Sequence, residues 1–170
     1  MYFATPKTME WIEKLKQESK KNGTVGCVVL DKQGNLTAGT STGGMFKKRW
    51  GRIGDSPVIG AGTYADNNSC AVSCTGHGEY FIRHAVAFDV CARYKYLKES
   101  VEKAADYIIH TELNTNAGNG GLIAVDKLGN IAMPYNSGGM FRGFLYKEKG
   151  SPEIKKGCGI GKKIVVVGEK

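Results

Sequence analysis

Among the threonines that stand beside glycines, Thr24, Thr42 and Thr75 have positions that suit nucleophilic chemistry. Thr24 follows Gly23 and opens the apolar run VGCVVL, which is typical of a buried strand. An internal threonine hydroxyl is a weak nucleophile. A threonine made amino-terminal by cleavage of the Gly23–Thr24 bond carries its own base, because an α-amino group has a pKa of about 7.7–8. The alternative is an ordinary threonine at the start of a strand, which local features alone favour.

Two further threonines favour the nucleophile. Thr42, in the segment TSTGG, ends a strand that returns from a short turn, so we expect it to lie beside Thr24. Thr75 ends an apolar strand just before Gly76 and Gly78, where a helix begins. Backbone N–H groups at a helix amino terminus can bind a carboxylate or a developing oxyanion. The alternative for Thr75 is ordinary helix capping.

The loop GRIGDSP carries opposite charges three residues apart. Arg52 can bind a carboxylate with two parallel hydrogen bonds, and Asp55 can accept an ammonium group. Together they predict a clamp for the head group of an amino acid. The alternative is a surface ion pair between the two side chains, which would contribute little.

The elements that position these residues follow from hydrophobic periodicity. The first segment predicts a helix after Thr5 and Pro6, followed by a polar linker over 17–23. Beyond the linker the pattern predicts strands that begin at Thr24 and cover Ser69–Cys74 and Lys163–Val167, and helices over Gly78–Tyr94 and Ser100–His110. Mixed strands and helices of this kind indicate an α+β fold in which the first of these helices is buried against a sheet.

Two segments repeat each other at an offset of 95 residues. Residues 27–35 and 123–130 both contain Asp-Lys-x-Gly-Asn, and the loops STGGMF and NSGGMF follow them. Each repeat predicts a hairpin, and the pair predicts a pseudo-symmetric sheet. The counterpart of Thr24 is Asn119, so one copy alone carries a hydroxyl at that position.

Composition excludes several classes of function. The net charge is +8, but the basic excess lies mainly in two short segments without interleaved aromatic residues, which argues against nucleic-acid binding. No apolar run reaches the 18–20 or so residues of a membrane span, and the first residues do not resemble a signal peptide. We therefore expect a cytoplasmic protein that binds neither nucleic acid nor membrane.

The cysteines indicate neither a disulfide framework nor a zinc site. The chain has five of them and no CxxC pair. The HGE segment at His77 resembles part of a zinc deaminase motif but lacks the PCxxC that must accompany it. We expect the cysteines to be small buried hydrophobic residues in a reducing compartment.

Four segments in order resemble the plant-type asparaginase and isoaspartyl peptidase family of N-terminal-nucleophile hydrolases, the relatives of glycosylasparaginase. They are GTVGCVVLDKQGNLTAGTSTGGM, GRIGDSPVIGAGTYADN, AVSCTGHGE and MPYNSGGMFRG. The resemblance implies the αββα sandwich of that family and self-cleavage between Gly23 and Thr24. Residues 1–23 then correspond to the end of the α segment and its cleavage linker, and 24–170 to the catalytic β subunit.

The resemblance also implies a role for each candidate residue. Thr24 matches the nucleophile and Thr42 the hydroxyl that orients it. The oxyanion donors correspond to Thr75 and the backbone of Gly76. The residues that match the grip on the α-carboxylate and α-amino groups of the substrate are Arg52, Asp55 and Gly78. The implied reaction is hydrolysis of L-asparagine and β-aspartyl dipeptides.

One half of the family's sequence has no counterpart here. The α segment of the family is much longer than 23 residues, opens with HGGAG, and carries a structural sodium loop. The resemblance therefore implies no metal or cofactor in this chain, and an α segment as partner in an (αβ)2 assembly. Two alternatives stay open, a glycosylasparaginase-type amidase and a non-catalytic fragment. The segment TSTGG favours the asparaginase side, because the glycan-cleaving relatives tend to have TSTNG.

Overall fold

The computed structural model describes residues 23–45, 48, 51–147, 154–159 and 165–168. The chain begins there with strands β1 (Thr24–Leu30) and β2 (Leu36–Thr42). The elements that follow are β3 (Thr63–Ala65), β4 (Cys70–Gly76), α2 (Gly78–Arg83), α3 (Val86–Ala92), the π-helical turn η1 (Arg93–Leu97), α4 (Val101–Tyr107), the π-helical turn η2 (Ile108–Glu112), α5 (Leu113–Thr115), β5 (Gly120–Asp126), β6 (Ile131–Ala132), β7 (Arg142–Lys147), β8 (Ile154–Gly159) and β9 (Val165–Gly168). The predicted amino-terminal helix and most of the segment 1–23 lie outside the described residues.

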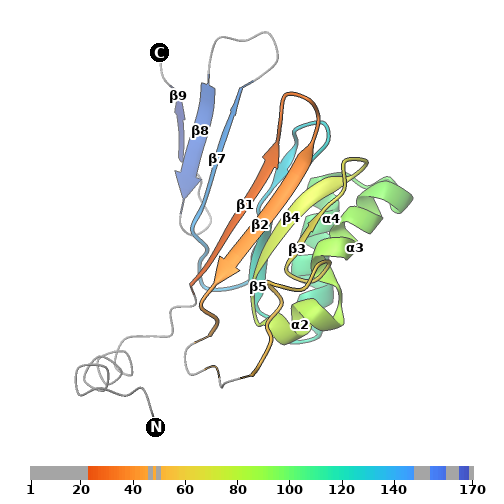
Figure 1. Cartoon of the computed structure of the whole chain (residues 1–170). Helices are drawn as coiled ribbons and strands as arrows, with labels where there is room; N and C mark the ends of the chain where they lie inside the picture. The colour runs from red at the N-terminus through yellow and green to blue at the C-terminus, as the bar shows by residue number, and fades with distance from the viewer. Residues whose placement is uncertain (1–22, 46–47, 49–50, 148–153, 160–164, 169–170) are drawn as a thin grey trace, which may run out of the picture.

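The described strands form three antiparallel sheets. β1 pairs with β2, a four-stranded sheet has the order β3-β4-β5-β6, and a third sheet has the order β7-β8-β9. Figure 1 shows the helices on one face of the four-stranded sheet and the β1–β2 hairpin on the opposite face, where β1 and β2 both contact β4. This helix–sheet–sheet stack confirms the α+β class.

Both predicted hairpins form, and each turn is held by one aspartate. The Asp31 carboxylate accepts the backbone N–H groups of Gln33 and Asn35 at 2.8 and 2.7 Å. The second hairpin repeats the arrangement, because the Asp126 carboxylate accepts the N–H groups of Leu128 and Asn130 at 2.8 and 2.9 Å. The two hairpins lie in two facing sheets rather than in one, so the predicted single pseudo-symmetric sheet is wrong.

The main core lies between the four-stranded sheet and the helices. Its largest fully buried side chains include Phe81, Ile108, Ile109 and Leu113. A smaller cluster lies between the two facing sheets and includes Leu36, Ala71, Val125, Val28, Leu30, Ala38 and Ile131. It fixes the β1–β2 hairpin against β4 and β5, and thereby places the amino-terminal end of β1.

The predicted helix over Gly78–Tyr94 is divided in two. It begins at Gly78 as expected, but Ala85 adopts a left-handed conformation with φ of 45° and separates α2 from α3. The backbone N–H groups of Ala87 and Phe88 then donate to the carbonyls of Ala61 and Gly60 at 3.1 and 2.8 Å. The break satisfies the free donors at the start of α3 and attaches this helix to the loop before β3.

The second predicted helix begins where expected and runs further. The Ser100 hydroxyl caps α4 by accepting the Lys103 N–H. The helical path then passes His110, because η2 and α5 continue it to Thr115 with Ile109 and Leu113 buried.

Several other expectations need correction. The strand predicted over Ser69–Cys74 is β4, which extends to Gly76. The last strand is β9, and most of its predicted start lies outside the described residues. The prediction that all cysteines are buried is wrong for Cys27 and Cys158, which are exposed on β1 and β8. In the described part of the chain, no helix has the length and apolar character needed to cross a membrane, and the cytoplasmic location stays a prediction.

Candidate functional site

The start of β1 brings two hydroxyls and one carbonyl together. Thr24 lies directly opposite Thr42 in the β1–β2 register, and its hydroxyl donates to Thr42 Oγ1 at 3.2 Å. The Thr42 hydroxyl donates to the carbonyl oxygen of Gly23 at 3.4 Å and accepts the Gly44 N–H at 2.9 Å. Thr42 therefore links the Thr24 hydroxyl, the candidate nucleophile, to the carbonyl of the Gly23–Thr24 bond. These three contacts use the one donor and both acceptor positions of the Thr42 hydroxyl.

A polar contact between the two sheets supports this end of β1. The Thr40 and Ser73 hydroxyls lie 2.6 Å apart, and Thr40 also donates to the Gly62 carbonyl at 3.2 Å. A Cβ atom at Gly26 would collide with the Ser73 side chain. Glycine at position 26 thus lets β1 approach β4 closely, and the Thr24 end of one sheet faces the Thr75–Gly76 end of the other.

A pocket opens beside the two threonines. Its wall comes from the start of β1, the loops on either side of Lys48, the end of β4 and the start of α2. The lining residues are Thr24, Thr42, Gly44, Met45, Lys48, Arg52, Gly54, Asp55, Ser56, Gly76 and Gly78. The structure thus brings most of the candidate site residues into one place from segments far apart in the sequence.

Gly76 marks the point where β4 becomes the lead into α2. Its φ is 147°, a conformation that residues with a Cβ rarely adopt, and an added Cβ would collide with the Asn119 carbonyl and the Gly120 Cα. The next residue, His77, donates its N–H to the Asn119 carbonyl at 2.9 Å. The tight approach of β4 to β5 therefore requires glycine at this position.

Thr75 lies one residue before Gly76 on β4, half-buried and paired with Gly121. It is absent from the residues that line the pocket. The helix N-cap is His77, without a side-chain hydrogen bond, so the capping alternative for Thr75 is wrong. The assignment of Thr75 and Gly76 as oxyanion donors stays a prediction.

Asp55 lies buried between two glycines. Cβ atoms added at Gly62 and Gly78 would lie 2.8 Å from Asp55 Oδ2 and 2.7 Å from Oδ1, respectively. Its Oδ2 atom is buried and has no hydrogen-bond partner in the structure. Burial raises the pKa of Asp55 above its ordinary value of 3.8, although the Lys48 charge opposes that shift. A buried carboxylate that lines a pocket and has one unpartnered oxygen is suited to receive a cationic group from a ligand.

Arg52 is on the same wall but pairs with another residue. Its Nη1 atom lies 3.8 Å from Glu79 Oε2, and both side chains are substantially exposed. The alternative of a surface ion pair between Arg52 and Asp55 is therefore wrong, because Asp55 is buried and the nearby carboxylate is that of Glu79. The guanidinium remains open to a ligand carboxylate from the solvent side.

Lys48 is a pocket residue that the sequence did not single out. Its side chain runs along Gly44, where an added Cβ would lie 2.6 Å from Lys48 Cδ, and its Nζ would lie 3.3 Å from a Cβ at Gly54. Two glycines thus leave space for the lysine between neighbouring loops. Lys48 carried no distinguishing signal because it stands in the basic run KKR.

The pocket therefore offers charges of both signs. Lys48 and Arg52 supply positive charge, and Asp55 supplies a buried acid. A ligand with both an ammonium group and a carboxylate matches this arrangement. Among the described residues there is no cluster of three or more His, Cys, Asp or Glu side chains that could hold a metal ion.

A family model and several known proteins resemble this chain. A family model described as asparaginase matches residues 4–154. The chain is 54% identical over 129 residues to an isoaspartyl peptidase of Salmonella typhimurium, covering 76% of this chain and 41% of that protein. It is 49% identical over 143 residues to an isoaspartyl peptidase of Escherichia coli, covering 78% of this chain and 44% of that protein.

A plant relative gives the same result. The chain is 53% identical over 120 residues to a probable isoaspartyl peptidase/L-asparaginase of Arabidopsis thaliana, which covers 71% of this chain and 36% of that protein. The chain thus spans less than half the length of these three relatives.

Proposed function

This chain belongs to the asparaginase family of N-terminal-nucleophile hydrolases, and on that premise we propose that it supplies the nucleophile and the substrate grip of an enzyme that hydrolyses L-asparagine and β-aspartyl dipeptides. The observation that carries the proposal is the contact of the Thr42 hydroxyl with both Thr24 Oγ1 and the Gly23 carbonyl. A structural threonine at the start of a strand does not need that arrangement.

The first step is cleavage of the chain by itself. Thr24 Oγ attacks the carbonyl carbon of Gly23 while its proton passes through the Thr42 hydroxyl, which also hydrogen-bonds to the carbonyl oxygen. The C–N bond breaks, the Thr24 nitrogen receives the proton, and Gly23 is left as an ester on the Thr24 oxygen. Water hydrolyses that ester, which releases the Gly23 carboxylate and leaves Thr24 with a free amino group and a free hydroxyl.

The second stage is hydrolysis of the substrate. The new amino group accepts the proton of Thr24 Oγ, which attacks the side-chain amide or isopeptide carbon of the substrate. Arg52 holds the α-carboxylate, Asp55 with the adjacent Gly78 receives the α-ammonium group, and Thr75 and Gly76 stabilise the oxyanion. Ammonia or an amine leaves, and water then hydrolyses the β-aspartyl ester on Thr24. These groups carry the reaction without a cofactor.

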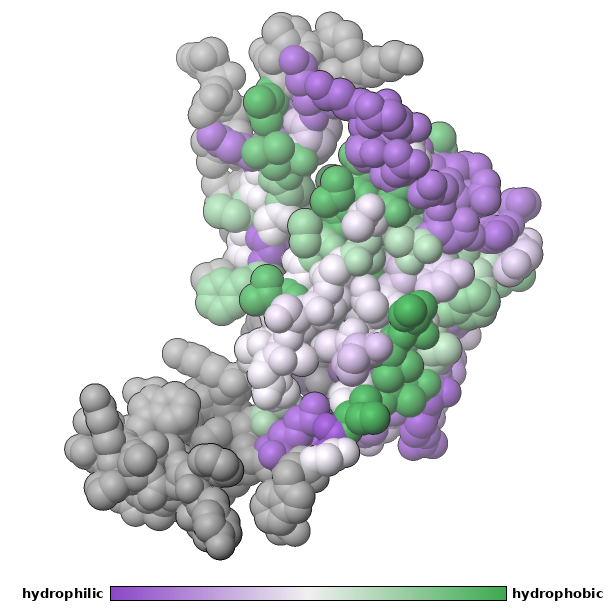
Figure 2. Space-filling model, viewed as in Figure 1, coloured by the Kyte–Doolittle hydropathy of each residue, from purple (hydrophilic) through white to green (hydrophobic). Residues whose placement is uncertain are grey.

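The enzyme also needs the α segment of its family. The outer face of β1 is largely exposed, with Val25 at 72% and Val29 at 47% of full exposure. In Figure 2 the surface over β1 and β2 is white to green, that is, weakly polar to hydrophobic. Burial of an apolar face stabilises an assembly. An uncovered strand edge can also pair with a further strand. We propose that an α segment covers this face and that two such pairs form an (αβ)2 enzyme.

Mass spectrometry tests the nucleophile. The chain is produced together with the α segment, and the cleaved product is expected to begin at Thr24. Thr24→Ala should leave the chain uncut, whereas the matched variant Thr24→Ser keeps a hydroxyl and should still be cut. Cleavage at another bond, or cleavage of Thr24→Ala, would exclude the mechanism. A cut enzyme that hydrolyses a glycosylated asparagine in preference to a β-aspartyl dipeptide would point to the amidase alternative.

A further inference from the structure

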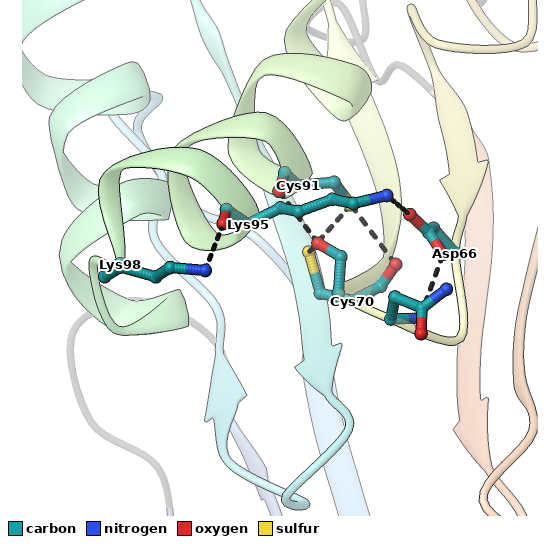
Figure 3. A network of polar contacts seen from close by, with 7 residues as sticks. Asp66, Cys70, Cys91, Lys95 and Lys98 are labelled. Carbon is teal, nitrogen blue, oxygen red and sulfur yellow. Dashed lines mark hydrogen bonds and ion pairs between the residues drawn. The ribbon is translucent and has the colours of Figure 1, made fainter.

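Two buried thiols outside the pocket lie in contact across the main core. Cys70 is the first residue of β4, and Cys91 lies near the end of α3. Figure 3 shows the two side chains pointing toward each other, and their sulfur atoms are 2.7 Å apart. A disulfide bond is about 2.0 Å long, so less than about 1 Å of movement separates the thiols from the bonded pair. We propose that Cys70 and Cys91 are a redox pair that a hydroperoxide converts into an intramolecular disulfide.

The surroundings of the pair give the two thiols different acidities. The contact between the two sulfurs lowers the pKa of Cys70, whereas the same contact together with burial raises the pKa of Cys91. The Ser69 hydroxyl also lies 3.6 Å from the Cys70 sulfur and donates to the Cys91 carbonyl at 2.8 Å. The pair thus contains one thiol that ionises more readily, and the thiolate is the nucleophilic form of cysteine.

The size of the access route selects the oxidant. Cys91 lines a small surface pocket of about 30 Å³ together with Tyr64, Phe88 and Lys95. A water molecule needs about 10–15 Å³ of such space, so the pocket admits hydrogen peroxide and excludes a peptide disulfide. Lys95 closes one side of it through an ion pair with Asp66 at 2.9 Å, which Figure 3 also shows.

The reaction balances with one peroxide for each pair of thiols. One of the two sulfurs attacks a peroxide oxygen, the O–O bond breaks, and the departing hydroxide takes the thiol proton and leaves as water. The other sulfur then attacks this sulfenic acid, the S–O bond breaks, and the hydroxyl leaves with the second thiol proton as a second water. Two thiols lose two electrons to form one disulfide, the peroxide is reduced to two waters, and a dithiol reverses the change.

The disulfide would enclose the oxyanion end of the site. Residues 70–91 contain Thr75, Gly76 and all of α2, and the bond would join the first residue of β4 to α3. Closing a loop between cysteines 21 positions apart restricts the unfolded chain. The oxidised protein should therefore unfold at a temperature higher by roughly 6–13 °C than the reduced protein.

Peptide mapping under non-reducing conditions tests the proposal. The full chain carries Cys27→Ser and Cys158→Ser to remove the exposed thiols, and it is treated with hydrogen peroxide, alkylated and digested with trypsin. Cleavage after Arg83 separates the two partners into the peptides 53–83 and 84–93. These two peptides should be joined by a disulfide that dithiothreitol removes. Peptides that stay separate, or either cysteine oxidised to a sulfinic acid without a link, would overturn the proposal.

Cys74 provides the matched control, because it is a buried thiol on the same strand and lies in the same tryptic peptide. Cys74→Ala should keep both the linked peptides and the higher unfolding temperature. Cys91→Ala, which changes volume by a similar amount, should lose both. A link that survives Cys91→Ala or disappears in Cys74→Ala would assign the chemistry to another pair. None of these readouts depends on asparaginase activity, so the result is independent of the proposed function.

Discussion

Gly78 offers a sharp test of how the pocket receives an ammonium group. A Cβ added at this position would lie 2.7 Å from Asp55 Oδ1 and 3.0 Å from the Asp55 backbone nitrogen. On its other side the carboxylate already lies against Gly62, where an added Cβ would stand 2.8 Å from Oδ2. The Asp55 carbonyl is also held, since it accepts the N–H groups of Val58 and Gly62 at 2.9 and 3.1 Å. Gly78→Ala must therefore displace the carboxylate or the start of α2.

Two energies set the expected size of the effect. Overpacking of a buried contact costs about 1–3 kcal/mol of stability. A hydrogen bond to a charged group contributes about 1.5–3 kcal/mol, which corresponds to a loss of about 10- to 150-fold in kcat/KM if the Asp55 contact with the substrate is lost. We expect both effects together in Gly78→Ala.

The assay compares two substrates and two variants. Gly78→Ala should lose activity toward L-asparagine. It should lose much less activity toward succinamate, which is asparagine without the α-amino group and therefore makes no contact with Asp55. Gly39→Ala on β2 is the control, since an added Cβ there meets no atom within 4 Å. Equal losses for both substrates, or an unchanged kcat/KM for asparagine, would show that Asp55 does not bind the ammonium group.

Three further predictions concern the charged residues of the pocket. Burial raises the pKa of Asp55 above 3.8, so the stability of the wild type falls as the pH rises from 3.8 to the folded-state pKa and stays lowered above it. Asp55→Asn should therefore unfold at a higher temperature than the wild type near neutral pH, with a difference that vanishes below about pH 3.8, and it should lose asparaginase activity. Lys48→Met removes a charge that lowers the pKa of Asp55, so the acid limb of the kcat/KM profile should move to higher pH, whereas Lys48→Arg should leave it in place. Arg52→Lys should lower kcat/KM for β-aspartyl dipeptides by about 5- to 150-fold, because lysine cannot make two parallel hydrogen bonds to a carboxylate, and an unchanged value would remove Arg52 from the site.

The parts of the site that the sequence predicted are those set by local geometry. The Asp31 turn fixes the register that places Thr42 opposite Thr24, and both the turn residues and the strand length are visible in the sequence. The helix start at Gly78 was also predicted from the local sequence. A short strand that is bounded by turn residues and glycines can be recognised from its own residues, without knowledge of distant contacts.

The parts that were missed depend on contacts between distant segments. The break at Ala85 has no local cause, because alanine favours a continuous helix, and it follows from the hydrogen bonds of α3 to Gly60 and Ala61. The place of Lys48 depends on two glycines in different loops. The exposed Cys27 follows from an uncovered face of β1, which no feature of the strand itself reveals.

The two copies of the repeated hairpin have different tasks at the same site. In the first copy Thr24 faces Thr42 across a regular ladder and reaches the Gly23 carbonyl. In the second copy the position of Thr24 is taken by Asn119, whose carbonyl accepts the His77 N–H at 2.9 Å and lies against Gly76.

The counterpart of Thr42 is Ser137, and its hydroxyl donates instead to the Gly139 carbonyl at 3.1 Å. The second hairpin therefore has no pair of hydroxyls at its open end, and its strand β5 supports the Thr75–Gly76 end of β4 through the ladder from Cys70 to Gly76. One hairpin presents the proposed nucleophile and the other holds the backbone that faces it. The Asn119 carbonyl packs against Gly76, which is the glycine proposed to face the oxyanion. A substitution on β5 near Asn119 should therefore distort the proposed oxyanion site without contacting Thr24.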